Sequence, residues 1–499
     1  MPTPGGSSGR SPLSRVIPRI GAVQARLTGM LPGAARPQSP SSSHRSTVAL
    51  SSSSSSLTVM PPSTPTLSET MSSRRLFSSS IAAGAAPRTR YTPSAQGVYC
   101  PEEPHMLHPK DGPWGFFPMR VGQLLMDKYE IVRKLGYGAH ASIWLAKIQK
   151  DHGYDYVVLK VMSINATLLE FIHETHETEV GQSFVALREA DKEHPGYAHC
   201  AATSFIGSVH SKWGIHYVCL LQPYGTSLGA LCAALPRRRL PLPVVKRVVK
   251  QMLLALHFLH NQLHVVHADF RLDNILLKLH ASKEDIDRFL RKYPAQTYPP
   301  IPEADPSSDT VLTVRSQPLP NLGLDPSLSN LEVCVSDYGN TVRADNINAD
   351  TPVFTADQVV APEQLLGHPW SYPVDIWALG VNTFLMLTGS VPFEHQNLAL
   401  SPDAAQLACM NSRLGPFPAH FLQRCARAAE YFDADGNVLH PVSPSWGGPL
   451  EGRLRESLGG EATPRDVRDA WSFIRRCLPV DPAERPTVEE LLADAWLAA

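Results

Sequence analysis

The chain has 499 residues, 43% of them hydrophobic, and a formal net charge of −1, so it can form one large two-lobed domain with a tail or three small domains. The chain has 45 Lys and Arg residues and 46 Asp and Glu residues. Residues 1–100 contain ten of the basic residues, all Arg, and one of the acidic residues, Glu69. This segment therefore carries +9 and the rest of the chain −10. An acidic body argues against nucleic acid as the main ligand and is compatible with a basic peptide substrate.

Cysteine spacing and hydropathy exclude further classes of protein. The eight Cys are scattered without a CxxC pair, which favours reduced core thiols over a disulfide framework or a zinc site. The most apolar run, residues 376–393, lacks charge but contains several polar residues. We expect it to form a buried core helix and not a membrane span.

The N-terminal segment is rich in Ser, Pro, Ala and Arg, and residues 51–56 are all Ser. Such a composition cannot bury enough apolar surface to fold, so we predict a disordered tail over residues 1–110. The same Arg-rich, acid-poor composition is typical of a mitochondrial transit peptide, most clearly at residues 71–80. A plain basic tail is an equally good interpretation.

Strands precede helices in the rest of the chain. Alternating apolar residues predict strands at 129–135, 144–146 and 156–161. Residues 278–330 contain eight Pro, which predicts an irregular insertion with one helix at 282–292; a strand at 331–335 and mostly helices follow. A helical stripe is formed by Val248, Met252, Leu253, Leu256 and Leu259. Strands first and helices later predict an α+β protein with a small β-rich lobe and a large helical lobe.

A glycine-rich turn lies between the first two predicted strands. Glycines there let the backbone approach phosphate oxygens and offer N–H groups to them, although a plain hairpin is the commoner meaning of such a pair. Lys160 ends the third strand and can pair phosphates if a carboxylate holds it. The turn comprises Leu135, Gly136, Tyr137, Gly138, Ala139, His140, Ala141, Ser142 and Ile143.

The strongest local signal is the polar segment at residues 267–277, which lies between a predicted helix and an apolar strand. Asp269 can accept a hydroxyl proton, Asn274 can bind a metal, and Arg271 can meet a phosphate charge. Asp337, which follows the next strand, is a second metal-ligand candidate, with Gly339 providing a bend.

Three later motifs acquire meaning from their order. They are Val360-Ala-Pro-Glu363, the segment 375–380 that begins Asp-Ile-Trp, and Arg485. Each alone is uninformative. Their order predicts a buried ion pair between Glu363 and Arg485.

Taken together, these motifs resemble the eukaryotic protein kinases over residues 129–497. Residues 117–138, the long insertion before Asp337 and residues 370–377 resemble the SR-protein kinases, especially fungal ones. The resemblance implies a kinase domain over 111–497, with an N-lobe at about 111–225 and a C-lobe at about 226–497. It also implies transfer of the γ-phosphate of ATP to Ser or Thr hydroxyls in Arg/Ser-rich proteins such as splicing factors.

The resemblance assigns roles to individual residues. Asp269 is expected to be the catalytic base, with Arg271 beside it; Lys160 binds ATP, and Asn274 with Asp337 binds Mg²⁺. The carboxylate that holds Lys160 is expected to be Glu179, from its distance before His194, and three other glutamates compete for that role. These are Glu174, Glu177 and Glu189.

Five positions depart from the family pattern. Ala141 replaces the third glycine, Arg271 the usual catalytic-loop Lys, Tyr338 a Phe or Leu, and Val360 an Arg. Ala268 replaces the Arg that normally reads a phosphorylated activation loop. We therefore predict activity without loop phosphorylation.

Two other functions compete with an active kinase. A pseudokinase would keep the fold as an ATP-binding or scaffold module, and Arg271 is its best support, but the intact Lys160, Asp269, Asn274 and Asp337 argue against it. A small-molecule kinase is disfavoured by residues 361–363 and the helical run after them. We expect ATP and Mg²⁺ as cofactors and a protein substrate, without direct nucleic-acid binding. The tail suggests mitochondria, whereas the family resemblance suggests cytosol and nucleus.

Overall fold

The structure is a computed structural model that describes residues 103, 115–299, 313–348, 351–394, 400–441 and 449–498. The described residues all belong to one unit of the chain. Apart from Glu103, the predicted tail lies outside the described residues, and so does the transit-like stretch. Its disorder and its targeting role therefore stay predictions.

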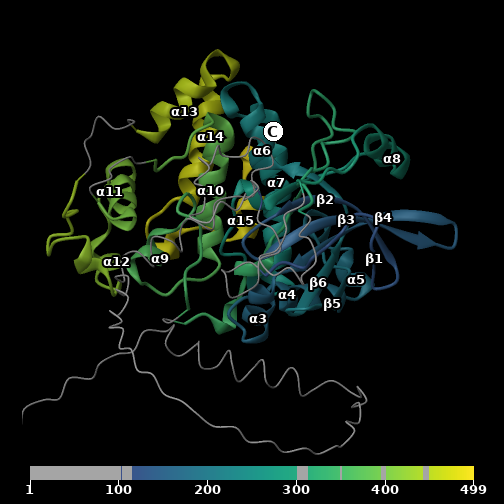
Figure 1. Cartoon of the computed structure of the whole chain (residues 1–499). Helices are drawn as coiled ribbons and strands as arrows, with labels where there is room; N and C mark the ends of the chain where they lie inside the picture. The colour runs from purple at the N-terminus through teal and green to yellow at the C-terminus, as the bar shows by residue number, and fades with distance from the viewer. Residues whose placement is uncertain are drawn as a thin grey trace, which may run out of the picture. The chain divides into compact units, whose positions relative to one another are not determined.

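The N-lobe contains a six-stranded antiparallel sheet with the order β1-β2-β3-β4-β6-β5. The strands predicted for this lobe are confirmed, and the observed strands are longer. Ile131, Trp144 and Leu159, one from each of three neighbouring strands, are buried in one cluster on a face of the sheet. Figure 1 shows β2, β3 and β4 side by side in blue. The strands are β1 (Leu124–Leu125), β2 (Tyr129–Tyr137), β3 (Ala141–Lys150), β4 (Gly153–Met162), β5 (Phe205–Ser211) and β6 (Gly214–Leu221).

Two small sheets follow in the C-lobe. One has the strand order β10-β9-β7 and the other pairs β11 with β8. The segment between β8 and β9 ends where β9 begins, at Ile275, and Ile275 pairs with Val335 at the end of β10. The segments after β8 and after β10 therefore lie next to each other. The strands are β7 (Tyr224–Ser227), β8 (Val265–Val266), β9 (Ile275–Lys278), β10 (Val333–Val335) and β11 (Val342–Arg343).

The C-lobe core is built around α7 (Leu242–Asn261) and α10 (Pro373–Thr388). All five residues of the predicted stripe on α7 are fully buried. Helix α10 contacts α7, α13 and α14, and an apolar surface on all sides suits such a central position. The remaining helices are α3 (Ile164–Phe171), α4 (Glu177–Val185), α5 (Glu189–Lys192), α6 (Leu228–Ala234), α8 (Lys283–Lys292), α9 (Pro362–Leu366), α11 (Pro402–Leu414), α12 (Ala419–Leu422), α13 (Leu450–Leu458), α14 (Pro464–Cys477), α15 (Val488–Leu492) and α16 (Ala495–Ala498).

Three predictions about the core are confirmed. Residues 376–388 lie in the buried helix α10, and within the described ranges no helix has the length and apolarity that crossing a bilayer requires. The seven described Cys are free and buried. Arg485 donates to both carboxylate oxygens of Glu363, at 2.6 and 2.7 Å, and neither side chain is exposed to solvent.

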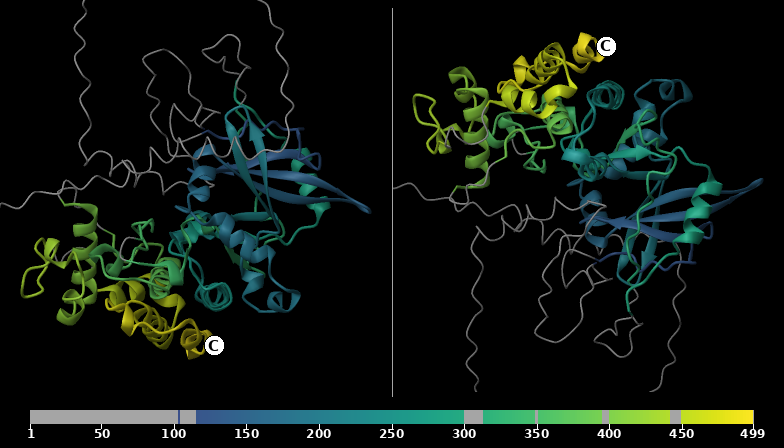
Figure 2. Two further views of the ribbon diagram at one scale, coloured as in Figure 1. Left: turned by 90° about the horizontal axis from the view of Figure 1, so that it is seen from below. Right: turned by 90° about the horizontal axis from the view of Figure 1, so that it is seen from above.

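The insertion at 278–330 leaves the C-lobe after β9 but packs against the N-lobe sheet. The predicted helix is confirmed as α8, whose N-terminus is capped by the Ser282 hydroxyl. Ile286 of α8 packs in one cluster with Leu145 and Tyr156 of the sheet. Asp287 accepts hydrogen bonds from Tyr156 at 2.7 Å and from Lys147 at 3.1 Å. In both views of Figure 2 the teal-green α8 lies beside the blue strands.

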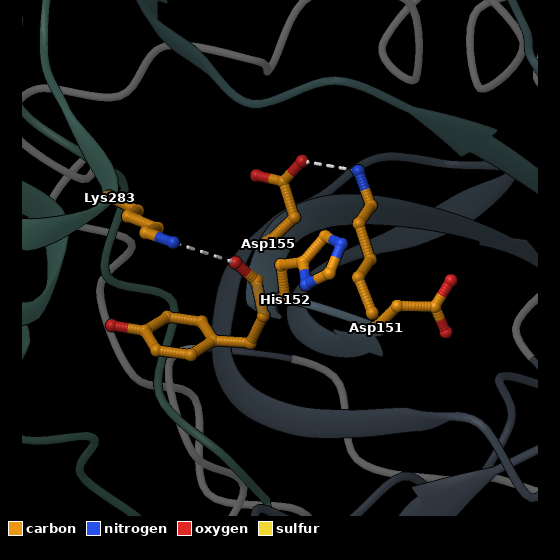
Figure 3. A pocket seen from close by; sticks show the side chains of 6 residues that line it. Asp151, His152, Asp155 and Lys283 are labelled. Atoms are coloured by element: carbon orange, nitrogen blue, oxygen red, sulfur yellow. Dashed lines mark hydrogen bonds and ion pairs between the residues drawn. The ribbon is translucent and has the colours of Figure 1, made fainter.

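A surface pocket of about 410 Å³ marks the meeting of α8 with the β3–β4 turn. Lys283 donates to the backbone carbonyl of Tyr154 at 3.4 Å, and Lys150 pairs with Asp155 at 2.7 Å. Figure 3 draws these contacts as dashed lines from Lys283 and from Asp155. None of the predicted site residues lines this pocket, so we regard it as part of the contact between the insertion and the sheet.

One residue that precedes the expected domain start at residue 111 contacts the domain, and the boundary itself stays a prediction. Glu103 is 6% exposed, and its carboxylate accepts a hydrogen bond from the ammonium group of Lys134 on β2 at 2.8 Å. A buried ammonium group is stable only when it is paired. The folded domain therefore includes at least this one residue of the predicted tail.

Candidate active site

The polar segment between β8 and β9 is fixed to the core by Asp375 of α10. Its carboxylate accepts hydrogen bonds from the backbone N–H groups of His267, at 2.8 Å, and Ala268, at 3.0 Å, and from the ring of His260 at 2.9 Å. Ala268 has a φ of 60°, which is strained for a residue with a side chain. The Asp375 contacts hold the strained turn in place.

Asp269 is held in a buried and polar environment. Asn274 donates through its side chain to the Asp269 backbone carbonyl at 2.9 Å and to its carboxylate at 3.0 Å. The Ala356 backbone N–H donates to the other carboxylate oxygen at 3.2 Å. Burial raises the pKa of the Asp269 carboxyl, whereas Arg271 and His267 oppose this shift. Asp269 and Asn274 therefore act as one rigid unit.

Lys160 on β4 joins the two lobes through two carboxylates. Its ammonium group lies 2.8 Å from Glu177 of α4 and 2.8 Å from Asp337, which follows β10. Burial alone lowers the pKa of Lys160, but the charges of Asp337 and Glu177 outweigh burial and raise it. The charge of Lys160 in turn lowers the pKa of Asp337. Lys160 and Asp337 are thus both charged at neutral pH.

The prediction that Glu179 holds Lys160 is wrong, because the structure places Glu177 there. Glu179 instead lies 3.1 Å from the His176 ring, and its side chain is 35% exposed. Successive residues of an α-helix are about 100° apart, so these two glutamates point to nearly opposite sides of α4. Glu177 was one of the competing candidates.

Sequence reasoning missed the residue that positions Glu177. The Glu170 carboxylate of α3 accepts hydrogen bonds from the backbone N–H groups of Glu177, at 2.9 Å, and Thr178, at 2.8 Å. A carboxylate at a helix N-terminus satisfies free N–H groups and interacts favourably with the helix dipole. An acid seven residues before a helix start is a weak signal, because the contact depends on the turn between α3 and α4.

Glu177 and Glu179 provide a direct test of the corrected assignment. Glu177→Gln should lower kcat/KM by about 10- to 100-fold, because a hydrogen bond to a charged group contributes about 1.5–3 kcal/mol. Glu179→Gln is the matched control, and it should leave kcat/KM near the wild-type value. Steady-state kinetics with varied ATP would measure both, and a larger loss in Glu179→Gln would contradict the assignment.

Two departures from the family pattern have a structural explanation. The Tyr338 hydroxyl donates to the Val335 carbonyl at 2.9 Å, and its ring lies 5.4 Å from that of Phe184, so the extra hydroxyl is satisfied inside the core. Arg271 is mostly buried and donates to Asp273, two residues away. The predicted cation also acts on Asp269, because its charge lowers the pKa of that carboxyl.

The glycine-rich turn connects β2 to β3. Gly138 donates through its backbone N–H to the Ala141 carbonyl at 2.8 Å, and the His140 carbonyl accepts from Ser163 at 2.8 Å. Ile143 lies opposite Lys160 in the β3–β4 register. The turn is therefore connected to Lys160 through two adjacent strands.

The segment between Asp337 and Glu363 bears on the prediction of activity without loop phosphorylation. Thr341 is fully buried, and the Thr355 hydroxyl donates to the Ala268 carbonyl and accepts from Gln364. The hydroxyl of Thr351, the third threonine of this segment, accepts from the Asn348 backbone N–H at 2.9 Å, so all three hydroxyls are covered or hydrogen-bonded. We expect unchanged kcat after phosphatase treatment and in a Thr351→Ala variant. Loss of activity in either experiment, measured as phosphate transfer, would contradict this prediction.

Asp269, Asn274 and Asp337 come from adjacent segments, since the Ser336 backbone N–H donates to the Asn274 carbonyl at 2.8 Å. A sheet lysine paired to a helix glutamate, combined with an Asp–Asn loop anchored on a buried helix, defines a protein kinase. The model of the protein kinase domain family matches residues 321–497.

Comparison with known proteins narrows the class. The chain is 27% identical over 395 residues to a serine/threonine protein kinase of Aspergillus fumigatus, covering 77% of this chain and 88% of the relative. It is 26% identical to the serine/threonine-protein kinase SRPK of Physarum polycephalum, covering 77% of this chain and 89% of the relative. SRSF protein kinase 3 of Sus scrofa is 28% identical over 38% of this chain and 33% of the relative. These matches support a serine/threonine protein kinase that resembles the SR-protein kinases.

Proposed function

We propose that this kinase uses Mg²⁺ and ATP to phosphorylate Ser in Arg/Ser-rich proteins, with Asp269 as the catalytic base. The observation that carries the proposal is the double pairing of Lys160 with Glu177 and Asp337, beside the bonded Asp269–Asn274 unit. Each group has the chemical character that its role requires, and each is held by buried partners.

Lys160 is suited to bind the phosphates of ATP. Glu177 fixes its ammonium group at 2.8 Å, so the cation needs little reordering when a phosphate arrives. The backbone N–H groups of residues 135–143 can provide further donors to phosphate oxygens. Together they would orient the nucleotide.

Asn274 and Asp337 fit a magnesium ion. A carboxylate and an amide oxygen are hard oxygen ligands, and Mg²⁺ typically takes one or two protein ligands and completes its shell with phosphates and water. The Asn274 side-chain nitrogen is engaged with Asp269, which leaves the amide oxygen available. Within the described ranges no group of three or more His, Cys, Asp or Glu forms a metal cluster, and a two-ligand site does not need one. A bound Mg²⁺ would neutralise phosphate charge.

Asp269 is suited to accept the proton of a substrate hydroxyl. Its two carboxylate oxygens are oriented by Asn274 and Ala356. Arg271 provides a cation on the same segment for the charge of the transferred phosphoryl group. These side chains therefore combine proton acceptance with charge stabilisation.

The proposed substrate class rests on the similarity to SR-protein kinases and on charge. Two of the relatives carry the names SRPK and SRSF protein kinase 3. Residues 101–499 of this chain carry a net charge of −10, and an acidic surface attracts Arg-rich segments.

Radiolabelled phosphate transfer from Mg-ATP by the full chain tests the proposal. An Arg/Ser-repeat peptide would be compared with a generic basic protein, beside an Asp269→Ala variant. We expect transfer to the repeat peptide that disappears in the variant. Transfer to the generic protein alone would overturn the substrate class, and ATP binding without transfer would indicate a pseudokinase.

A further inference from the structure

The stretch of residues 355–357 is bonded directly to the segment that carries the proposed base. The Ala356 backbone N–H donates to the Asp269 carboxylate at 3.2 Å, and the Thr355 hydroxyl donates to the backbone carbonyl of Ala268. The residue that follows Ala356 therefore has a fixed position close to the place where a substrate hydroxyl must bind.

Asp357 is that next residue, and its backbone is held while its carboxylate is available. Gln406 of α11, itself buried, donates to the Asp357 backbone carbonyl at 3.2 Å. The Ala356 carbonyl accepts from the N–H groups of Val359 and Val360, at 3.0 Å each, so Asp357 lies in a closed turn. Asp357 is exposed, and its carboxylate makes no ion pair or hydrogen bond with another residue that the structure describes.

Three other acids of the site are already paired. Asp273, on the same segment as Asp269, accepts from Arg271, and Lys160 pairs with both Asp337 and Glu177. Each of these carboxylates would have to share or give up its cation before it could bind a cation of the substrate. Asp357 meets no such competition, so it is the carboxylate best placed to receive a positively charged substrate side chain.

We propose that Asp357 binds the guanidinium group of an Arg that directly flanks the phosphorylated Ser of the substrate. The inference rests on the proposed function and deepens it, because it assigns the recognition of Arg in an Arg/Ser-rich substrate to one residue. Asp357 then determines specificity, while Asp269 takes part in the chemistry.

Chain dimensions place a flanking Arg within reach of Asp357. A substrate hydroxyl must come within about 2.6–3.2 Å of the Asp269 carboxylate to transfer its proton, and the Ala356 N–H lies 3.2 Å from the same carboxylate. Consecutive Cα atoms are about 3.8 Å apart, both from Ala356 to Asp357 and from the Ser to its neighbours. The long side chain of Arg can span a gap of this size, and its planar fork matches a carboxylate in a bidentate pair.

Peptides that differ at one position test the inference. Each contains a single Ser in an Arg-rich sequence, with either Arg or its uncharged isostere citrulline directly before or directly after the Ser, and kcat/KM is measured with the full chain. In the wild type we expect citrulline to lower kcat/KM by about three- to tenfold at one of the two positions, the range of a partly exposed ion pair. In Asp357→Asn this preference for Arg should fall below about twofold.

Asp151→Asn is the matched control, because it removes the same charge from an exposed position in the turn between β3 and β4. In Figure 3 no dashed line reaches the Asp151 carboxylate. This variant should keep the full preference for Arg. Charge reversal provides a second readout, which a merely structural role would not change: Asp357→Arg should prefer a peptide with Glu over one with Arg at the same position.

The outcomes separate this inference from the proposed function. If Asp357→Asn or Asp357→Arg kept the wild-type preference for Arg, or if Asp151→Asn lost it equally, the role of Asp357 would be overturned and the substrate class would stand. If the wild type did not distinguish Arg from citrulline, the inference would fall while the kinase activity would stand. If the wild type transferred phosphate to none of the peptides, the proposed substrate class would fall, and the inference with it.

Discussion

Asp269→Asn should lower kcat by about 10²–10⁴-fold, the range expected when a general base is removed. The amide has nearly the shape of the carboxylate, so it can still accept from the Ala356 N–H, but it cannot take up a proton. Its NH₂ group would also face the Asn274 side-chain nitrogen, which now donates to Asp269 at 3.0 Å. Single-turnover phosphate transfer would measure the loss.

The pH dependence of the phosphate-transfer rate provides an independent test of Asp269 as the base. Asp269 must be ionised to accept a proton, and burial raises its pKa. The rate of the wild type should therefore fall as the pH decreases through this raised pKa, by about tenfold per pH unit below it. This acid limb should be absent in Asp269→Asn. A kcat within threefold of wild type would contradict the role of Asp269.

Motifs fixed by local chain geometry were predictable. Asp269 and Asn274 are five residues apart on one short segment, and their side chains can meet whatever surrounds them. The helical stripe of α7 and the strands of the N-lobe follow from side-chain periodicity, which repeats every 3.6 or 2 residues. The Glu363–Arg485 pair is distant in sequence, and it was predicted by the order of motifs in a resembling family.

Contacts between distant segments were not predictable in the same way. Choosing correctly between Glu177 and Glu179 required the exact start of α4, and helix boundaries are uncertain by one or two residues. The pairing of Glu103 with Lys134 could not be predicted, because the composition around Glu103 is that of a tail. The docking of α8 on the N-lobe sheet depends on Asp287 meeting Lys147 and Tyr156, and no local pattern in the insertion specifies those partners.

The largest stability effect is expected at the buried ion pair of the C-lobe. Glu363→Gln keeps the size of the side chain but leaves Arg485 charged and fully buried. The remaining acceptors of Arg485 are the backbone carbonyls of Pro373 at 2.8 Å and Pro479 at 2.9 Å, with Val480 at 3.3 Å. Because backbone dipoles cannot neutralise a full charge, we expect a loss of about 3–5 kcal/mol in the free energy of unfolding, measured by urea denaturation.

Two further variants separate the buried charge from side-chain loss in general. Glu451→Gln breaks the exposed pair with Arg455, whose atoms are 2.7 Å apart, and should cost less than about 1 kcal/mol. Glu363→Gln combined with Arg485→Met removes both charges and should recover much of the loss, since apolar replacement of a buried pair is often nearly neutral. A double variant as unstable as the sum of its single variants would mean that packing around Trp377, whose ring lies 5.0 Å from the guanidinium group, and not the charge, makes Arg485 necessary.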